Sequence, residues 1–331
     1  MKILYVTPNS TDPLAFYRGT GPLSRLRRDN HEFDFVDCKD ISWASVYNHD
    51  LVMMHRPHRE EHLMIAKICE KWATPLVLDY DDWLLDLSES NPAFEIYRGS
   101  RQALIEIAKC ADATFVATEK LKELQESIGG KNVVVVPNAY DSKLFPYRKN
   151  KQERNRIFLW RGGNSHTQDV LSIKDGFERL MKKHPQWQFV FIAQPPWWLD
   201  KSIKNIHYIA GLGIYEYFKC IWDLGPAIMA HPLTNSDFNK AKSMCSWLEA
   251  THAGAAFVGP KFKEFERPGI THYEAENPDS FFEVCDDLIM NPIKIIKNIE
   301  LSEQEVFTNL ELTKVNELRY NVFSQLQTSR G

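Results

Sequence analysis

A cation, a hydroxyl and a carboxylate stand at helical spacing in the second half of the sequence. Lys242, Ser246 and Glu249 occupy positions i, i+4 and i+7, so a helix over 241–252 brings them to one side. Gly254 then ends this helix, and a short apolar strand follows. A cation and a carboxylate held together beside a sheet suit a ligand that carries phosphates and a sugar ring.

A second group is the turn made of Arg161, Gly162 and Gly163, which follows an expected strand over 157–160. The two glycines leave room for a diphosphate, and the guanidinium can neutralise its charge. An exposed arginine on an ordinary turn is the alternative. We favour the diphosphate because Lys242 supplies a second phosphate contact on a parallel element.

Three carboxylates, Asp79, Asp81 and Asp82, stand at the end of an expected strand over 75–79, next to Trp83. Like charges this close repel unless a cation, a hydroxyl or a helix N-terminus compensates. Three interpretations compete, namely a helix cap, a divalent-metal site, and a base and hydroxyl clamp beside a sugar. The metal is the least favoured because no clear partner ligands stand elsewhere in the chain.

Basic side chains gather at the end of the expected strand over 51–55. They are His55, Arg56, His58 and Arg59. At the carboxyl end of a buried strand they predict contact with an anion or a sugar, and structural histidines are the equal alternative.

Near the N-terminus, Gly19, Thr20 and Gly21 precede an amphipathic helix. Glycines let a backbone approach a ligand, and the amides that begin a helix attract phosphate. A plain turn into the helix explains the same residues at least as well.

Both halves of the chain alternate short apolar strands with helical patterns, which predicts two parallel sheets covered by helices. The expected strands are 2–7, 32–36, 51–55, 75–79, 114–117, 133–137, 157–160, 188–193, 206–209, 227–230 and 256–259. The expected helices are 60–72, 100–109, 119–127, 169–183, 215–221, 241–252, 281–289 and 303–326. A polar, basic stretch over 147–156 predicts a linker, so we expect two doubly wound domains with a cleft between them.

Composition is that of a globular protein. The 331 residues exceed one ordinary core, and 44% of them are hydrophobic while 25% are charged. A net charge of −4 disfavours a mainly electrostatic DNA-binding protein, although it leaves room for a local basic groove. The six scattered cysteines predict free thiols in a reducing compartment. With no signal peptide and no membrane span expected, the predicted location is cytoplasmic.

Four segments resemble the motifs of one known family. They are Gly19-Thr-Gly21, Val136-Pro-Asn-Ala-Tyr-Asp141, Trp160-Arg161-Gly162, and the run from Leu248-Glu-Ala to Phe257-Val258. In this order, over most of the chain, they resemble the retaining glycosyltransferases of the GT-B fold, which include bacterial lipopolysaccharide mannosyl- and glucosyltransferases. The element Phe238-Asn-Lys-Ala-Lys242-Ser243 is similar to one found in a divergent phage and bacterial branch.

The resemblance implies an α/β protein of two Rossmann-like domains around an interdomain cleft. An acceptor domain is expected over 1–147 and a nucleotide-sugar donor domain over 148–310. A terminal helix over 311–331 is expected to pack back toward the first domain.

The resemblance, together with the residue patterns described above, assigns residues to roles. The expected catalytic residues are Asp79, Asp81, Asp82, Arg161 and Lys242. The expected donor-binding residues are Gly19, Thr20, Gly21, Arg161, Gly162, Gly163, Lys242, Ser243 and Glu249. The expected acceptor-binding residues are His55, Arg56, His58, Arg59 and Trp83. Glu249 would bind the ribose, while Arg161 and Lys242 would hold the diphosphate. The chain departs from the family at Ala241, where a sugar-binding glutamate is usual.

The expected function is therefore transfer of a sugar, with retention, from a UDP- or GDP-sugar to an acceptor hydroxyl. The acceptor would be a glycan or a hydroxymethylated base in phage DNA. For DNA, a phosphate track would be formed by Arg25, Arg27, Arg28, Arg56, Arg59 and the cations of the linker over 147–156. No cofactor is required, and a divalent metal is possible but not expected. Two alternatives stay open, a non-catalytic nucleotide-sugar or glycan-binding module and a sugar-nucleotide epimerase of the same fold.

Overall fold

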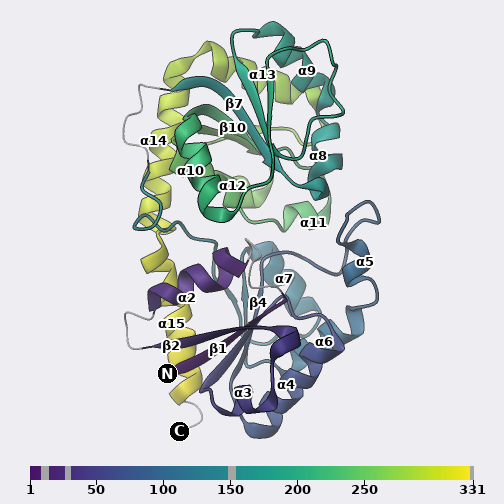
Figure 1. Ribbon diagram of the computed structural model, residues 1–331, viewed down its shortest axis with the longest axis vertical. Coiled ribbons are helices and arrows are strands. Elements are labelled where there is room, and N and C mark those ends of the chain that lie inside the picture. Colours follow the sequence, from purple (N-terminus) through teal and green to yellow (C-terminus); the bar gives the residue numbers. More distant parts are fainter. Residues whose placement is uncertain (9–14, 27–30, 148–153, 329–331) are drawn as a thin grey trace.

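The protein consists of two lobes, each built on a parallel six-stranded sheet (Figure 1). The computed structural model describes residues 1–8, 15–26, 31–147 and 154–328. Most of the predicted linker over 147–156 therefore lies outside the described residues. Within the described part, both sheets carry helices on their two faces, which confirms the α/β fold expected from the alternating pattern.

The first sheet has the strand order β2-β1-β3-β4-β5-β6. Its strands are β1 (Lys2–Thr7), β2 (Glu32–Asp37), β3 (Leu51–His55), β4 (Leu76–Tyr80), β5 (Ala113–Val116) and β6 (Val133–Val135). The helical segments of this part of the chain are η1 (Phe16–Thr20), α2 (Gly21–Leu26), η3 (Cys38–Asp40), α3 (Trp43–Tyr47), α4 (Glu60–Trp72), α5 (Phe94–Tyr97), α6 (Arg101–Cys110) and α7 (Glu119–Ser127).

The second sheet has the order β12-β11-β10-β7-β8-β9. Its strands are β7 (Asn155–Gly162), β8 (Gln188–Ala193), β9 (Ile206–Ile209), β10 (Pro226–Ala230), β11 (Ala256–Pro260) and β12 (Ile270–Tyr273). The helical segments that follow β7 are η4 (Asn164–His166), α8 (Thr167–Leu171), α9 (Lys174–Lys183), α10 (Ile214–Leu224), α11 (Asp237–Lys240), α12 (Cys245–Ala253), η5 (Lys263–Phe265), α13 (Pro278–Met290), α14 (Pro292–Asn309) and α15 (Leu312–Thr328).

Each sheet is buried on both faces, which explains the continuous apolar runs of its strands. In β1, Ile3 and Tyr5 pack into one apolar cluster, while Leu4 and Val6 pack into another on the opposite face. Two further clusters cover the faces of the second sheet in the same way. The strands are thereby fixed in register, so the loops that leave their carboxyl ends are held on rigid supports.

The chain crosses between the lobes a second time near its C-terminus. One helix over 303–326 was expected, but the structure has two, α14 and α15, which meet at Leu310 and Glu311. The residues between α14 and α15 are bonded to the segment that leaves the first lobe. The Tyr140 amide donates to Leu310 O (2.8 Å), and the Leu312 amide donates to Tyr140 O (2.9 Å). Figure 1 shows α14 beside the second lobe and α15 beside the first.

Helix α15 packs on the first sheet through apolar side chains. Val315 and Phe323 lie in the same cluster as Ile3 and Tyr5 of β1. Asn316 donates a hydrogen bond to Pro22 O at 2.9 Å, which connects the terminal helix to α2 of the first lobe.

Several other elements also differ from the expectation. The strand β12 was not expected, and the helix over 169–183 is divided into α8 and α9. The helix over 241–252 begins only at Cys245, because the preceding residues are bonded to the first lobe. Thr118 Oγ1 donates to Ala241 O (2.9 Å), and Asn138 Nδ2 donates to Ser243 Oγ (2.7 Å).

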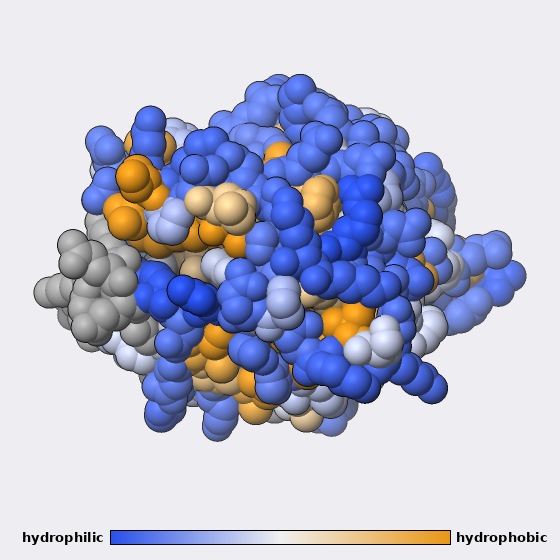
Figure 2. All heavy atoms as spheres, turned by 90° about the horizontal axis from the view of Figure 1, so that it is seen from above, coloured by the Kyte–Doolittle hydropathy of each residue, from blue (hydrophilic) through white to orange (hydrophobic). Residues whose placement is uncertain are grey.

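The outer face of the second lobe is mainly hydrophilic, with hydrophobic side chains in separate small groups (Figure 2). None of the helices in the described ranges has both the length and the apolar character needed to cross a membrane.

Candidate active site

A cleft of about 480 Å³ lies between the lobes, at the carboxyl ends of β4, β7, β8 and β10. This is the edge where ligands bind in doubly wound folds. The lining residues are Tyr17, Asp81, Asp82, Arg161, Gly162, Gly163, Ser165, His166, Ile192, Ala193, Gly211, Leu212, Ile214, Tyr217, His231, Lys242, Ser243, Cys245, Ser246 and Glu249. Most of the residues predicted to bind a donor are thus brought to one place.

Glu249 of α12 and Arg161 of β7 form a bidentate ion pair in the cleft. Arg161 Nε donates to Glu249 Oε2 (2.7 Å), and its Nη2 donates to Oε1 (2.9 Å). Burial lowers the pKa of Arg161, but the Glu249 carboxylate outweighs it, so the pKa lies above its usual value. The guanidinium is therefore a permanent cation.

Two tyrosines complete the shell of the carboxylate. Tyr17 Oη donates to Glu249 Oε1 (2.9 Å) and Tyr217 Oη donates to Oε2 (2.8 Å). Each carboxylate oxygen therefore accepts two hydrogen bonds, which uses the lone pairs of both. Tyr17 comes from η1 of the first lobe, so its bond also joins the lobes.

Lys242 approaches the cleft from the loop before α12, rather than from the helix itself. Its Nζ lies 3.7 Å from Asp82 Oδ1 and 4.3 Å from the centre of the Phe238 ring. Ser243, Cys245 and Ser246 line the cleft where α12 begins. The predicted grouping of Lys242, Ser246 and Glu249 occurs in the cleft, but the helical spacing accounts only for the last two.

The carboxylates of the first lobe lie opposite, after β4. Asp81 accepts bonds from Arg56 Nε (2.5 Å) and His55 Nε2 (3.2 Å), while Asp82 accepts from Arg56 Nη2 (2.6 Å). Burial raises the pKa of Asp81, but the Arg56 charge and His55 outweigh it, so the pKa lies well below its usual value. His55 and Arg56 thus hold Asp81 as a carboxylate, and Arg56 fixes the neighbouring Asp82 in front of Lys242.

Arg56 achieves this position with an unusual backbone. Its φ of 49° lies in the left-handed region, which non-glycine residues adopt rarely and at some energetic cost. Its amide donates to Asp79 O at 2.9 Å, which anchors the turn on β4. The conformation turns the guanidinium toward both Asp81 and Asp82.

Asp79 does not line the cleft, contrary to the catalytic part expected of it. Both of its oxygens are bound by Arg18, whose Nε and Nη2 donate at 2.7 Å and 3.0 Å. Both side chains are fully buried. Arg18 Nη1 also donates to Val136 O and Asn138 Oδ1. This geometry gives Asp79 a structural part in the core of the first lobe.

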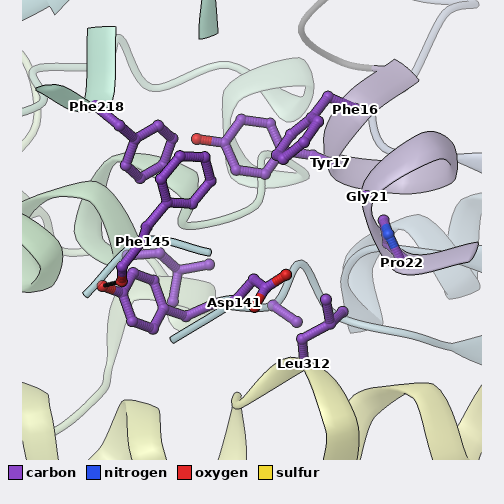
Figure 3. Close-up of a pocket in the computed structure, with 11 residues that line it drawn as sticks. Phe16, Tyr17, Gly21, Pro22, Asp141, Phe145, Phe218 and Leu312 are labelled. Carbon is purple, nitrogen blue, oxygen red and sulfur yellow. Dashed lines mark hydrogen bonds between the residues drawn. The ribbon is translucent and has the colours of Figure 1, made fainter. Parts of the chain in front are cut away.

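The residues Gly19, Thr20 and Gly21 are also absent from the lining. They lie at the end of η1 and the start of α2, where a side chain on Gly19 would lie 2.0 Å from the Tyr5 ring. Gly19 is therefore explained by packing. Gly21 lines a separate small cavity beside Phe145 and Phe218 (Figure 3).

The acceptor-binding group is divided in the same way. His58 and Arg59 lie at the N-terminus of α4, where the His58 and Arg59 amides both donate to His62 Nδ1. Trp83 is buried beside Ala241 instead of offering a face to a sugar. None of the five residues expected to bind an acceptor lines the cleft. His55 and Arg56 act on it indirectly, because they bond to the cleft carboxylates of Asp81 and Asp82.

Ala241 is fully buried where the lobes meet. It packs in a cluster with Trp83 and Leu121 of the first lobe, and its carbonyl accepts from Thr118. A carboxylate at this position would be buried among apolar side chains. The departure from the family motif is therefore matched by an apolar contact between the lobes.

The structure is similar to several solved structures. HepE of Anabaena in complex with UDP matches with a TM-score of 0.70 at 12% identity, covering 98% of this chain and 100% of the other. An alpha-glucosyltransferase in complex with UDP and a 13-mer DNA containing an HMU base matches at 0.69 and 14%, covering 98% and 99%. The chain has the GT-B fold. A putative UDP-N-acetylglucosamine 2-epimerase from Listeria monocytogenes matches at 0.59 and 12%, covering 96% and 94%.

At these identities the likeness establishes the GT-B fold alone. No protein-family model and no curated protein matches the sequence. Among the described residues, no three or more histidine, cysteine, aspartate or glutamate side chains form a group that could hold a metal ion.

Among the lining residues of the GT-B cleft that were not predicted are two tyrosines and two histidines, namely Tyr17, Tyr217, His166 and His231. The tyrosines reach Glu249 from segments 232 and 32 residues away along the chain, so spacing gave no signal for them. The histidines each follow a predicted strand, β7 and β10. Searching every loop after a strand for polar side chains would have found these two.

Proposed function

We propose that the protein is a glycosyltransferase that uses a nucleotide-diphosphate sugar, with UDP or GDP as the nucleotide. The observation that carries the proposal is that Arg161, Lys242 and the start of α12 converge on one cleft between two GT-B lobes. Two cations and a helix N-terminus match the charge of a diphosphate. HepE, which has been solved with UDP-glucose, supports a UDP-sugar as the first donor to test.

In this mechanism the leaving diphosphate gains negative charge as the bond to the sugar breaks. Arg161 and Lys242 stabilise this charge more in the transition state than in the bound donor, which lowers the barrier. Glu249 would take the ribose hydroxyls once one of its present donors gives way. Retention of configuration is proposed from the family resemblance.

The first lobe, over 1–147, is proposed to bind the acceptor, and 148–310 to bind the donor. Asp82 and Asp81 face the donor side from the first lobe, and their carboxylates can orient an acceptor hydroxyl toward the anomeric carbon. Arg56 holds both carboxylates in place through its hydrogen bonds. Asp79 is left out of this proposal because Arg18 uses both of its oxygens.

The acceptor is proposed to be a glycan hydroxyl, with a hydroxymethylated base in DNA as the second candidate. The DNA-bound alpha-glucosyltransferase supports the second candidate. The ion pairs favour the glycan, because arginines that were expected to bind DNA phosphates are already paired within the protein. Arg25 is bound by Asp141, and Arg56 is bound by Asp81 and Asp82. Arg27 and Arg28 lie outside the described residues. DNA binding that weakens steeply with added salt would favour DNA.

The proposal is tested by thermal shift with UDP, GDP and their glucose and mannose derivatives, followed by assays of donor turnover. We expect Arg161→Ala and Lys242→Ala to lose most of the shift and to lower kcat by about 10²–10³-fold. Arg156→Ala, on the same strand, and Lys240→Ala, outside the cleft lining, are the matched controls.

The outcomes separate the alternatives. Binding without turnover would indicate a non-catalytic module. Release of nucleotide with an altered sugar and no acceptor would indicate an epimerase. Nucleotide shifts that are unchanged in both cleft variants would refute the donor site.

A further inference from the structure

His166 has a fixed position at the edge of the cleft. It ends η4, directly after the glycine turn of β7, and its Nδ1 lies 2.9 Å from Asp169 Oδ2. The other oxygen of Asp169 accepts from the Thr234 amide (2.8 Å), the Thr234 hydroxyl (2.8 Å) and Asn239 Nδ2 (2.7 Å). A buried carboxylate with these partners is held rigidly, and it holds the imidazole in turn.

These bonds decide which nitrogen carries the proton. Burial raises the pKa of Asp169, but the hydrogen bonds from His166 and Thr234 outweigh it and keep the pKa below its usual value. Asp169 is therefore ionised and can only accept, so Nδ1 of His166 must donate. Burial also lowers the pKa of His166, so the ring is neutral and its Nε2 bears a lone pair.

The neighbours of His166 show what this lone pair can bind. The ring lines the cleft with Arg161 and Lys242, and the His231 ring lies 5.1 Å away. Burial lowers the pKa of His231 well below its usual value, so His231 adds no charge. No hydrogen bond joins Nε2 of His166 to any other group in the described part of the chain.

A neutral acceptor beside two cations suits a hydroxyl next to a phosphate. A phosphate oxygen has no hydrogen to donate to Nε2, whereas a sugar hydroxyl has one. The proposed function already assigns Glu249 to the ribose and the Asp81 and Asp82 carboxylates to the acceptor, and Ala241 offers no carboxylate.

We infer that His166 accepts a hydrogen bond from a hydroxyl of the donor sugar, and that Asp169 is the residue that positions it. The inference rests on the proposed function and names the part of the cleft that recognises the sugar rather than the nucleotide. His166 here takes the place of an acidic contact at position 241.

Two substitutions of His166 separate its nitrogens. His166→Asn keeps a donor near Asp169 but removes the acceptor in the cleft. His166→Gln keeps an acceptor near the position of Nε2 and loses the bond to Asp169. Binding of UDP is compared with binding of UDP-glucose, UDP-galactose and UDP-N-acetylglucosamine by calorimetry, using the sugar that wild type binds best.

In His166→Asn we expect the affinity for the UDP-sugar to fall about 3–10-fold, while the affinity for UDP changes less than twofold. His166→Gln should recover part of the loss. Equal weakening of UDP and UDP-sugar would make His166 a phosphate contact and overturn the inference, as would no change in either. Failure of wild type to bind any nucleotide would instead count against the proposed function.

The positioning role of Asp169 is tested by asking whether the losses of affinity in single and double variants add. Asp169→Asn lets the imidazole turn its protonated nitrogen into the cleft, so we expect the same selective loss of UDP-sugar affinity. The double variant Asp169→Asn with His166→Asn should lose no more than His166→Asn alone. An additive loss, or a loss of UDP affinity as well, would overturn this assignment.

Discussion

At the scale of single residues, the meaning of a side chain depended on partners distant in the sequence. Asp79 and Asp82 are close neighbours in one acidic loop, yet Arg18 encloses the first while the second faces Lys242. The sequence could predict that the carboxylates need compensating cations. It could not predict which cation would pair with which carboxylate, because Arg18 lies 61 residues before Asp79.

Ala241 leads to the first prediction. The side chain is fully buried against Trp83, so Ala241→Glu would place a carboxylate in an apolar contact between the lobes. We expect a loss of about 3 kcal/mol or more in the free energy of unfolding, because a buried unpaired charge is costly. Urea denaturation of wild type and variant measures it.

The control is Asn235→Glu, which adds the same charge at an exposed position nearby. A variant Ala241→Glu as stable as this control would mean that the lobes separate enough to hydrate the carboxylate. The burial of position 241 would then be a property of one arrangement of the lobes only.

At the scale of elements, the strands were predicted well and the helix starts less well. Continuous apolar runs such as 133–136 identify buried parallel strands, but β12 contains Thr271 and His272, whose polar side chains hid it. The helix over 241–252 had a correct apolar pattern. Its first turn was lost because Ala241 and Ser243 bond to the first lobe, which local periodicity cannot reveal.

Helix α7 gives the second prediction, since its N-terminus is capped from the other lobe. Glu264 accepts from the Glu119 amide (3.0 Å) and the Lys120 amide (3.4 Å). Burial raises the pKa of Glu264 above its usual value, although these amides oppose the rise. A raised pKa in the folded state means that this group contributes most stability below its unfolded pKa, and that the contribution falls as pH rises through the folded pKa.

The measurement is the free energy of unfolding of wild type minus that of Glu264→Gln, from pH 4 to pH 7. We expect the difference to decrease as pH rises, because glutamine does not titrate. Glu266→Gln, at an exposed neighbouring position, should give a smaller dependence. A difference that increases with pH would show that the charged carboxylate is the favoured cap.

At the scale of the whole molecule, the proposed donor site and the contact between the lobes share one carboxylate. Glu249 holds Arg161 and Tyr217 from the second lobe and Tyr17 from the first. A ribose that binds Glu249 must therefore displace a donor. Tyr17 is the partner whose release also loosens the lobes, so we expect nucleotide binding and lobe opening to be coupled.

The third prediction follows from this competition. Tyr17→Phe removes one hydrogen bond to Glu249, so the affinity for UDP should rise about 2–10-fold. Calorimetric titration with UDP measures it. Tyr215→Phe is the control, because Tyr215 is exposed and packs against Phe16 without contacting Glu249. Weaker binding in Tyr17→Phe would indicate that the tyrosine contacts the nucleotide itself.

Because α15 packs on the first lobe, it determines the order in which the two lobes can be completed during synthesis. Val315, Arg319 and Phe323 complete the core beside β1, yet they are synthesised after every strand of both sheets. All the strands of the second sheet are therefore available before α15, although the first lobe precedes the second along the chain. Until then, part of one apolar face of the N-terminal sheet stays uncovered, and this is the stage at which a chaperone would find a binding surface on the nascent chain.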